Sequence, residues 1–461
     1  MTLNEMENKF KPFRDKFSNT NIPEPAINSF KNAYFKLLNG QKGYISSSEA
    51  GPVDRIPHIN ELEKYKTSQI KKAAIIKLNG GLGTSMGLQG PKSMLVAKDG
   101  LTFLDILVNQ VISYNKSHNS YVPLIFMNSF STERPTLNAL LDHPELKQSL
   151  PTTFIENKVP KVLKEDLSPA NWPENPTLEW APPGHGDIYA ALLESGMLDK
   201  LLDLEYEYAF ISNSDNLGAT IDSRIYGYME QEDIPFLMEV TRRTVNDKKG
   251  GHLAQNPNGQ LMLREVAQCP ENELEDFQNI EKYKYFNTNN IWINLRKTKE
   301  LREQNSGNFD LPMIVNEKNV DPTNNSSPKV YQLETAMGAA IKIYKGAKAI
   351  EVDRDRFIPI KKTTDLLILW SDIYRLNPDY LLVSQMELPS ITEVKLDDNY
   401  YKFINDMSER FPYGAPSLKQ CAKFEVVGDF IFGKDIKAIG NVKIENTNSK
   451  QVTIDGNTIL Q

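Results

Sequence analysis

Cysteine is scarce in this sequence, which has only Cys269 and Cys421 among its 461 residues. Two cysteines are too few for a disulfide framework or for a zinc site built from thiolates. Long hydrophobic runs are also missing, since the stretch 121–127 is far shorter than the roughly 20 residues that span a bilayer. Residues 1–16 lack the hydrophobic segment of a signal peptide. We therefore expect a cytoplasmic protein that makes no contact with a membrane.

An excess of basic residues is missing as well. The chain has 53 Lys and Arg against 60 Asp and Glu, which gives a net charge of −7. Broad binding to nucleic acid needs a basic face, so this composition argues against a nucleic-acid partner. A small polyanion held in a locally basic pocket is still compatible with it. The length predicts roughly three folding units of about 150 residues each.

Short hydrophobic runs, rich in β-branched and aromatic residues, recur between 70 and 360. Runs of this length favour buried strands of a parallel or mixed sheet. They lie at 73–78, 122–127, 209–211, 235–238 and 291–293. Helical patterns at 101–113 and 188–202 alternate with them. Such alternation of strands and helices predicts an α/β fold.

The chain divides into four segments on this pattern. They are an N-terminal helical segment 1–70, a core 71–365, a helical connector 366–421 and a C-terminal segment 422–461. A helix is expected to begin at Asp365, because residues 363–365 supply capping groups before a hydrophobic run. Glycines punctuate short strand-like runs in the C-terminal segment. Those runs predict a small β-solenoid, with a β-meander as the alternative.

The most informative segment is 77–93, which follows the first predicted strand. Five glycines lie among residues 80–90, so the backbone can approach a ligand closely and present N–H groups to an anion. Neither of two familiar phosphate loops fits. Pro91 precedes Lys92 where a Walker A loop needs glycine, and Met86 stands where a dinucleotide fingerprint needs glycine. The segment therefore predicts a third kind of nucleotide loop, with a glycine-rich surface turn as the alternative, and Lys92 is expected to bind phosphate.

Three further polar residues lie beside predicted elements. Asp215 follows the strand 209–211, where a carboxylate next to phosphates suits Mg²⁺, although an Asx turn would also explain it. His185 lies between two glycines and is expected to bind a ligand rather than pack in the core. Asp187 is expected to cap the helix that begins at 188. The small residues at 335–340 are expected to permit close helix packing.

These segments resemble a known family. Residues 78–87 (LNGGLGTSMG) and 90–93 (GPKS) are similar to the signature of eukaryotic-type UDP-glucose pyrophosphorylases, also called UTP–glucose-1-phosphate uridylyltransferases. Similar motifs follow in the family's order at 182–187, 212–216, 249–251, 287–290, 332–336 and 356–361. The resemblance extends from about residue 30 to the end of the chain, and the C-terminal segment resembles the family's β-helix.

The resemblance implies a fold, a reaction and its partners. The fold would be a Rossmann-like nucleotidyltransferase core with a mixed sheet, plus a small C-terminal β-helix domain. In the family reaction a phosphate oxygen of glucose 1-phosphate attacks the α-phosphorus of UTP in line, so that UDP-glucose forms and pyrophosphate leaves. The reaction depends on Mg²⁺ and needs no covalent enzyme intermediate. Catalysis would then consist of positioning and electrostatic stabilisation.

The resemblance also assigns roles to residues. Lys92 and Lys361 would be the catalytic residues, because they would hold the phosphates from two sides. Neighbours on an extended segment point to opposite faces, so only one of Lys361 and Lys362 is expected to face the site. The similarity of the Pro-Ile-Lys motif to the family selects Lys361. Asp215 would bind Mg²⁺. The nucleotide would contact Leu78, Asn79, Gly80, Gly81, Lys92, Glu156, Gly184, Asn213, Ser214 and Asp215. The sugar phosphate would contact His185, Gly251, Glu265 and Asn289.

The sequence departs from the family at two places. Glu156 stands where the family carries glutamine, and an ionised glutamate accepts from uracil N3–H but cannot donate to a carbonyl. Another donor could serve that carbonyl, the pKa of Glu156 could be shifted, or Asn157 could take the role. The chain also ends at Gln461, before the longer terminal β-helix of octameric members, which predicts a monomer or a weak dimer.

Two other functions are compatible with these motifs. A broad-specificity UDP-sugar pyrophosphorylase, or a UDP-N-acetylhexosamine pyrophosphorylase, would share the nucleotide motifs and differ in the sugar that it accepts. A non-catalytic nucleotide-binding scaffold is the remote alternative. The retention of Lys92, Asp215 and Lys361 argues against the scaffold.

Overall fold

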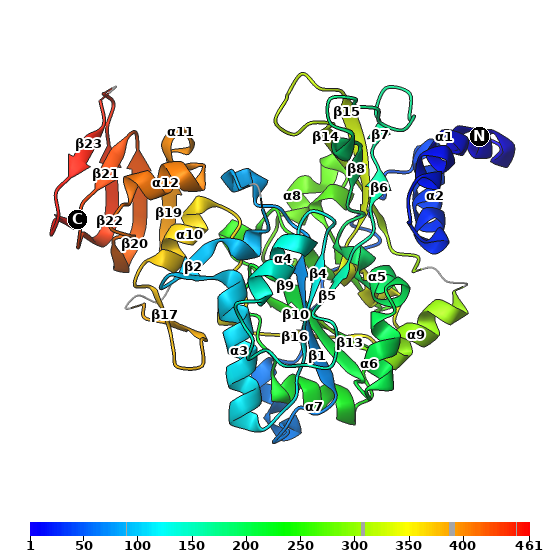
Figure 1. Ribbon diagram of the computed structural model, residues 1–461, viewed down its shortest axis with the longest axis horizontal. Helices are drawn as coiled ribbons and strands as arrows, with labels where there is room; N and C mark the ends of the chain where they lie inside the picture. The colour runs from blue at the N-terminus through cyan, green and yellow to red at the C-terminus, as the bar shows by residue number, and fades with distance from the viewer. Residues whose placement is uncertain (89, 306–308, 387–391, 449) are drawn as a thin grey trace.

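The computed structural model describes residues 1–88, 90–305, 309–386, 392–448 and 450–461. A mixed sheet forms the centre of the molecule (Figure 1), and in the described residues it has nine strands. Their order is β12-β11-β13-β9-β1-β4-β5, and β10 pairs with β13 and β16. The bounds are β1 (Ala73–Asn79), β4 (Leu124–Asn128), β5 (Thr153–Ile155), β9 (Tyr208–Asn213), β10 (Phe236–Arg242), β11 (His252–Gln255), β12 (Leu261–Arg264), β13 (Tyr285–Asn294) and β16 (Lys348–Glu351).

The sheet confirms the α/β architecture and the mixed strand directions. Strand β1 is parallel to β4 and β9, whereas β13 is antiparallel to β9 and β10. Each of the five predicted runs is a strand, namely β1, β4, β9, β10 and β13. Strand β13 is much longer than its predicted run 291–293, because the polar residues 287–290 belong to it as well. Hydrophobicity alone does not indicate those residues.

Helices cover both faces of the sheet and form two cores. Residues of β1 alternate between these faces, as strand geometry requires. Ile75 packs in one core with α3 and α7, while Ala74 and Ile76 pack in the other with α5 and α6. The helix bounds are α1 (Leu3–Ser18), α2 (Glu24–Leu38), α3 (Phe103–His118), α4 (Glu133–Leu140), α5 (Ile188–Glu194), α6 (Met197–Asp203), α7 (Ser223–Gln231), α8 (Leu274–Phe277), α9 (Leu295–Gln304), α10 (Thr363–Trp370), α11 (Asp398–Tyr401) and α12 (Ile404–Arg410).

Two helix predictions need correction. The single helix predicted at 188–202 is broken into α5 and α6 at Gly196, whose φ of 71° lies in the left-handed region that favours glycine. The helix predicted to begin at Asp365 begins at Thr363 instead. The carboxylate of Asp365 lies in the first turn and accepts hydrogen bonds from the N–H groups of Lys361 (2.8 Å) and Lys362 (2.9 Å). It therefore fixes the backbone that carries both lysines.

The N-terminal helices form an aromatic cluster of their own. Phe10, Phe13 and Tyr34 of α1 and α2 are buried against one another, and Leu333 of a second sheet packs on them. That sheet consists of β14 (Met313–Asn319), β15 (Lys329–Thr335) and β7 (Val162–Leu163). Figure 1 shows α1 and α2 on the opposite side of the molecule from the C-terminal strands.

The C-terminal part of the chain forms parallel strands. Strands β19 (Glu393–Leu396), β20 (Ser417–Val427), β22 (Lys437–Glu445) and β24 (Ile459–Leu460) make one sheet, and β21 (Phe430–Phe432) pairs with β23 (Val452–Ile454). Strands β17 (Tyr374–Leu376) and β18 (Leu382–Ser384) precede them. The segment 366–421, for which the sequence predicts a helical connector, contains strands as well as the helices α10, α11 and α12. Charged and hydrophobic residues alternate in its short strands, as in β19. The sequence alone therefore hardly distinguishes these strands from the segments around them.

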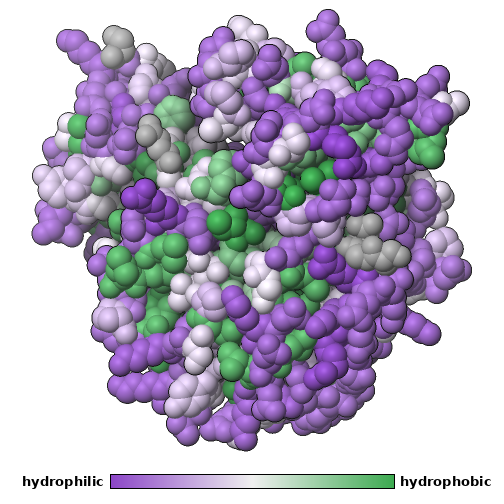
Figure 2. Space-filling view, turned by 45° about the vertical axis from the view of Figure 1, so that its right-hand side comes forward, coloured by the Kyte–Doolittle hydropathy of each residue, from purple (hydrophilic) through white to green (hydrophobic). Residues whose placement is uncertain are grey.

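The remaining short strands are β2 (Val96–Lys98), β3 (Leu101–Thr102), β6 (Val159–Pro160) and β8 (Trp180–Ala181). Hydrophilic residues cover most of the face that Figure 2 shows, and hydrophobic residues gather toward its middle. In the described part of the chain, no helix combines the length and the apolar character that crossing a bilayer requires.

Candidate functional site

A cavity of about 340 Å³ opens at the carboxyl ends of β1 and β9. Ligands of open α/β sheets bind at this edge. The cavity wall contains ten of the residues that the sequence predicts to bind nucleotide or sugar phosphate: Leu78, Gly80, Gly81, Lys92, Glu156, Gly184, His185, Asn213, Ser214 and Asp215. Leu82, Met127 and Pro182 also line it, and the sequence had assigned them no contact with a ligand.

Lys92 joins three segments of this cavity. Its Nζ atom donates to Oδ2 of Asp215 at 2.7 Å and also donates to the carbonyl oxygen of Ile360. The two charged side chains are 18% and 16% exposed, so solvent screens their attraction only in part. The N–H group of Lys92 donates to the carbonyl oxygen of Gly81 at 3.3 Å, which closes the base of the glycine-rich loop. The ammonium group of Lys92 thus connects the glycine-rich loop, the carboxylate of Asp215 and the segment that precedes Lys361.

Asp215 supplies a carboxylate that fits the demands of Mg²⁺. Among the described residues, no group of three or more His, Cys, Asp or Glu side chains is placed to hold a metal ion. Mg²⁺ in phosphate sites commonly takes one or two carboxylates and completes its shell with phosphate oxygens and water. Within the described chain, Oδ1 of Asp215 accepts no hydrogen bond, and neither oxygen accepts from the backbone, so the Asx-turn alternative is not supported. The single carboxylate therefore suits a metal that arrives with a nucleotide.

Glu156 and Gly80 lie against each other in the cavity wall. Glu156 is 8% exposed, and a Cβ atom on Gly80 would lie 2.3 Å from its Oε1 atom. A side chain at position 80 would therefore displace this carboxyl group from its place. Burial, with a smaller contribution from the charge of Asp187, raises the pKa of Glu156 to about 8. At neutral pH the carboxyl is therefore mostly protonated, and it offers both a donor and an acceptor.

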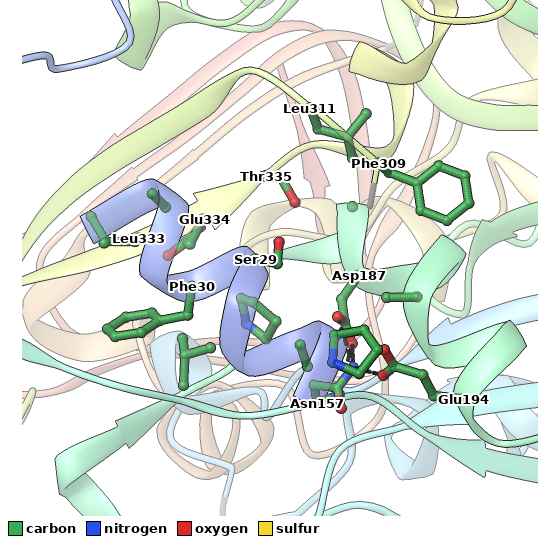
Figure 3. A pocket seen from close by; sticks show the side chains of 17 residues that line it. Ser29, Phe30, Asn157, Asp187, Glu194, Phe309, Leu311, Leu333, Glu334 and Thr335 are labelled. Carbon is green, nitrogen blue, oxygen red and sulfur yellow. Dashed lines mark hydrogen bonds between the residues drawn. The ribbon is translucent and has the colours of Figure 1, made fainter. Parts of the chain in front are cut away.

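Asn157 and Asp187 do not have the roles that the sequence left open or predicted for them. The Asn157 side chain donates to both oxygens of Asp187 (3.0 and 3.1 Å) and to Glu194 (3.0 Å), so it is engaged away from the cavity. Asp187 does not cap α5 with its side chain. Its carboxylate instead accepts the N–H group of Asn157 at 2.7 Å. Because Asn157 donates to both oxygens of the buried Asp187 carboxylate (Figure 3), neither oxygen turns toward the helix N-terminus.

Asn79 is likewise turned away from the cavity. Its Nδ2 group donates to Oδ1 of Asn128 (2.8 Å) and to Oγ1 of Thr136 (2.9 Å). Its Oδ1 atom accepts from the hydroxyl of Ser214 at 3.1 Å. Asn79 is 2% exposed. Its side chain therefore holds β1 and the loop after β9 in place, so a contact of Asn79 with a nucleotide would fall to its backbone.

His185 is held in one tautomer. Its Nδ1 atom accepts the N–H group of Met337 at 3.0 Å, so the proton of the neutral ring resides on Nε2. Burial lowers the pKa of His185 to about 4, and the ring is neutral at pH 7. The flanking glycines allow a close approach of β15, because a Cβ atom on Gly184 or Gly186 would lie within 2.5 Å of Thr335. The histidine is consequently locked against the start of a 3₁₀ turn, η9 (Met337–Lys342).

The other predicted sugar-site residues gather in a neighbouring cluster. A Cβ atom on Gly251 would lie 2.4 Å from Oε1 of Glu265. Asn287 donates its N–H group to Gly251 (3.0 Å) and its Nδ2 group to Oδ1 of Asn289 (2.9 Å). Burial raises the pKa of Glu265, and the charge of Lys361 opposes that rise. The charge of Lys361 thus favours the ionised form of Glu265 in this cluster.

The 3₁₀ turn η9 connects the cluster to the cavity. Met337 contacts His185, and a Cβ atom on the next residue, Gly338, would lie 3.3 Å from Nδ2 of Asn287 and 2.9 Å from Leu263. The small residues 335–340 were predicted to permit close helix packing, but 337–340 belong to the 3₁₀ turn η9, and Gly338 lets that turn pack closely on strand residues instead. The residues of the nucleotide cavity and those of the predicted sugar cluster therefore lie on two sides of η9.

A buried ion pair below the site was missed from the sequence. Glu239 is fully buried and accepts both Nε (2.9 Å) and Nη2 (2.7 Å) of Arg356, together with Nε1 of Trp292 (2.9 Å). The carbonyl oxygen of Arg356 accepts the side-chain amide of Asn216, next to Asp215. The only sequence signal was that Arg356 begins the motif 356–361, since Glu239 lies in an otherwise hydrophobic strand. The pair anchors the segment that leads to Lys361.

Comparisons with known proteins identify relatives of this chain. The family described as UTP–glucose-1-phosphate uridylyltransferase matches residues 27–438. The UTP–glucose-1-phosphate uridylyltransferase of Musa acuminata is 38% identical over 451 residues, which cover 95% of this chain and 94% of that one. The enzyme of the same name from Saccharomyces cerevisiae is 37% identical over 414 residues, covering 88% of this chain and 82% of that protein.

Solved structures are similar over nearly the whole chain. The crystal structure of UDP-glucose phosphorylase from Trypanosoma brucei has a TM-score of 0.92 and 41% sequence identity, and the match covers 98% of both chains. A point mutant of UDP-glucose pyrophosphorylase from Leishmania major, in complex with UDP-glucose, has a TM-score of 0.89 and 42% identity. That match covers 97% of both chains.

Proposed function

Because this chain belongs to the UTP–glucose-1-phosphate uridylyltransferase family, we propose that it makes UDP-glucose and pyrophosphate from UTP and glucose 1-phosphate. The observation that carries the proposal is the meeting of Lys92 and Asp215 at 2.7 Å in a cavity lined by the glycine-rich loop. A cation and a carboxylate at a strand edge suit a triphosphate and its metal. Family membership names the substrates that fit this chemistry.

The reaction is a direct displacement on phosphorus. A phosphate oxygen of glucose 1-phosphate forms a bond to the α-phosphorus of UTP while the bond from that phosphorus to the β-phosphate oxygen breaks. Pyrophosphate leaves with the electron pair. No covalent enzyme intermediate is needed, so the chain supplies positioning and charge. Lys92 neutralises the phosphate chain from the loop side, and Lys361 does so from the side of the sugar cluster.

Mg²⁺ is the cofactor that fits Asp215. When bound, the ion would neutralise charge on the phosphate oxygens, and Asp215 is the residue that would hold it. In the structure, the ammonium group of Lys92 donates a hydrogen bond to Oδ2 of Asp215. A bound triphosphate offers Lys92 a second anionic partner, so the same two side chains can hold phosphate and metal together.

Uracil recognition falls to the wall formed by Gly80, Gly81 and Glu156. The protonated carboxyl of Glu156 can donate to a uracil carbonyl and accept from uracil N3–H, as an amide would. Gly81 leaves open space above its Cα atom, since a Cβ atom added there would meet no atom within 4 Å. A planar base therefore has room next to the loop backbone.

The sugar phosphate lies between His185 and the cluster of Gly251, Glu265 and Asn289. The Nε2–H group of His185 is the free donor of a neutral ring and would bind a phosphate oxygen. Carboxylate, amide and backbone groups in the cluster suit the hydroxyl groups of a hexose. Glucose is proposed because of the family, since these polar groups alone would also accept related hexoses.

The proposal also covers the fold type, the localisation and the oligomeric state. We place the core among Rossmann-like nucleotidyltransferases and the parallel C-terminal strands in a short β-helix. A cytoplasmic enzyme that is a monomer or weak dimer stays a prediction.

The decisive experiment measures pyrophosphate release from UTP with glucose 1-phosphate, galactose 1-phosphate or N-acetylglucosamine 1-phosphate at equal concentrations. Rapid release with a preference for glucose of more than about tenfold, which corresponds to about 1.4 kcal/mol, is expected. A smaller preference would indicate a broad-specificity UDP-sugar pyrophosphorylase. Binding of UTP without any release would indicate a nucleotide-binding scaffold and would refute the proposed activity.

A further inference from the structure

Lys77 is a buried lysine that has no part in the proposed chemistry. It lies in the central strand β1 and is 2% exposed. Its ammonium group lies over the ring of Phe210, 5.7 Å from the ring centroid, and Lys77 does not line the nucleotide cavity. Within the described residues, no carboxylate accepts a hydrogen bond from it. Because an ammonium group buried without an ionic partner is costly, packing alone does not explain this lysine.

The ammonium group of Lys77 joins the two ends of one loop. Residues 214–218, the Asp215 loop, follow β9 directly. Nζ donates to Oγ of Ser212 at 2.7 Å, before this loop, and to the carbonyl oxygen of Ala219 at 2.7 Å, just after it. Ser212 is also the register partner of Lys77 in the neighbouring strand. One side chain therefore closes the base of the loop that carries Asp215.

Other polar side chains hold the Asp215 loop on one side of Asp215 only. Asn79 accepts a hydroxyl group at the start of the loop (3.1 Å), and Gln110 donates to a carbonyl oxygen near its end (3.2 Å). Among the described residues, Lys77 is the side chain whose hydrogen bonds lie on both sides of Asp215. Its removal would therefore loosen the two ends from each other, whereas the other contacts each hold one end.

The charge of Lys77 is unfavourable in this place. Burial, together with the charge of Arg356, lowers the pKa of Lys77 to about 7. The charges of Glu239 and Asp215 oppose this shift, although Glu239 is already paired with Arg356. A methionine would fill the same space without this penalty. The presence of an amine therefore points to the hydrogen bonds that it donates, and through them to the Asp215 loop.

We propose that Lys77 is a positioning residue, which holds the Asp215 loop so that the carboxylate of Asp215 can bind Mg²⁺ at the cavity. This role rests on the proposed function, because it needs the metal ion that Asp215 would hold. Lys77 itself touches neither metal nor phosphate. Without the amine, the buried hydroxyl of Ser212 and carbonyl of Ala219 lose this donor, and the loop is expected to move until another group or water replaces it. Asp215 would then leave the place at which it meets Lys92.

The test removes these hydrogen bonds in two ways. Lys77→Met keeps a side chain of similar length and deletes the amine, whereas Ser212→Ala keeps the lysine and deletes one acceptor. Lys161→Met is the matched control, since Lys161 is also buried, donates to a carbonyl oxygen at 2.8 Å and does not line the cavity. Denaturant titrations verify that each variant is folded. Should Lys77→Met fail to fold, Ser212→Ala carries the same comparisons.

Three readouts separate the loop, the metal and the nucleotide. Hydrogen exchange of the backbone amides at 213–219, measured by mass spectrometry without metal or nucleotide, reports how firmly the loop is held. The Mg²⁺ concentration for half-maximal pyrophosphate release reports the metal requirement. Calorimetric titration with UTP in the presence of EDTA reports whether the nucleotide site is intact.

We expect exchange at 213–219 to become about tenfold faster in Lys77→Met, and to change in the same direction in Ser212→Ala. The Mg²⁺ requirement should rise about tenfold in Lys77→Met, which is the lower end of the range for residues that orient metal ligands. Both quantities should keep their wild-type values in Lys161→Met. The affinity for UTP in EDTA should change less than about twofold in all three variants.

Asp215→Asn distinguishes a residue that acts through Asp215 from one that serves the fold in general. When Lys77→Met is added to Asp215→Asn, the Mg²⁺ requirement should equal that of Asp215→Asn alone, because no carboxylate is left to position. The same rise in both backgrounds would overturn the proposal. Unchanged exchange at 213–219, or an unchanged Mg²⁺ requirement in folded Lys77→Met, would overturn it as well.

The readouts also separate this role from the proposed function. No pyrophosphate release from the wild type, with UTP bound, would refute the proposed function and the metal role together. The exchange measurement needs neither metal nor turnover, so it still decides whether Lys77 holds the loop.

Discussion

The Nζ atom of Lys92 lies 2.7 Å from Oδ2 of Asp215, although 123 residues separate the two in the chain. Strands β1 and β9 are parallel neighbours, so the loops that follow them meet at one edge of the sheet. The contact neutralises both charges before a ligand arrives. In the proposed reaction the pair opens toward a phosphate and a metal ion. Lys92 and Asp215 should consequently show different defects when each is altered.

Lys92→Ala should lower turnover about 10²- to 10³-fold, because it removes a cation aimed at the charge that develops on the phosphates. Steady-state measurement of pyrophosphate release checks this. Lys71→Ala is the matched control, since Lys71 is exposed at the opposite end of β1. The control should keep wild-type turnover, and both variants should keep the wild-type circular dichroism spectrum. Near-normal turnover of folded Lys92→Ala would contradict the assigned role.

Removal of divalent cations with EDTA should abolish turnover, and Mg²⁺ should restore it. Asp215→Asn should raise the Mg²⁺ concentration for half-maximal rate by at least the roughly tenfold that even an outer-shell partner contributes. A Mg²⁺ titration of the rate measures this shift separately from any change in kcat. Asp142→Asn, an exposed carboxylate on another loop, serves as the control. An unchanged Mg²⁺ requirement in Asp215→Asn would exclude Asp215 as the metal ligand.

Lys361 and Lys362 provide a built-in comparison. Both backbone N–H groups bind Asp365, so alanine at either position keeps the local backbone contacts. Of the two lysines, Lys361 is the one whose charge opposes the rise that burial causes in the pKa of Glu265 in the sugar cluster. We expect kcat/KM for glucose 1-phosphate to fall about 10²-fold in Lys361→Ala and to change less than about twofold in Lys362→Ala. A larger loss in Lys362→Ala would reverse the assignment.

Glu156 should make UTP binding depend on pH. Its pKa of about 8 predicts tight binding below pH 8 and weaker binding above it, because only the protonated form donates to uracil. Glu156→Gln should bind UTP at least as well as the wild type at pH 7, and its affinity should stay constant to pH 9. Calorimetric titrations at several pH values measure both curves. A severe loss of affinity in Glu156→Gln at pH 7 would mean that the carboxyl has a role that an amide cannot fill.

The same group should affect stability in a defined direction. The folded protein holds a proton on Glu156 up to about pH 8, whereas the ordinary value is 4.5. Between these values the native state binds more protons than the unfolded state, so this group lowers stability as the pH rises. Glu156→Gln should therefore lose less stability than the wild type between pH 5 and pH 8 in denaturant titrations.

The residues next to regular strand ends were predictable from the sequence. Lys92 and Asp215 each follow a hydrophobic run that forms a central strand, and parallel strands bring their carboxyl ends together. Family resemblance then pointed to Glu156, which no local pattern identifies, and to a role for His185, whose flanking glycines had already marked it as a candidate. The sequence shows the glycines that flank His185, but it does not show why glycine is needed at these two positions. They make room for Thr335, about 150 residues away.

Side-chain directions were the part that the sequence could not supply. Asn79 lies in the signature motif, yet its amide turns into a buried network with Asn128. Asp187 directly precedes a helix, where capping is the default expectation, but Asn157 claims its carboxylate. Glu239 lies in a hydrophobic strand, and its partner Arg356 is 117 residues away. Such long-range polar pairs depend on tertiary placement, which local spacing does not encode.

His185 should be neutral wherever the enzyme works. Burial lowers its pKa to about 4 against an ordinary value of 6.5. The unfolded chain therefore binds more protons between these values, and the stability that this group contributes is present above about pH 6.5 and is lost as the pH falls toward 4. In His185→Asn, Oδ1 can still accept the N–H group of Met337, but nothing titrates. The difference in melting temperature between pH 7 and pH 4.5 should be smaller in His185→Asn than in the wild type.

The His185→Asn variant also lacks the Nε2–H donor, so kcat/KM for glucose 1-phosphate should fall about ten- to a hundredfold, as expected for a hydrogen bond to a charged group. An unchanged kcat/KM together with the altered pH dependence would show that the ring serves the fold and does not touch the sugar phosphate.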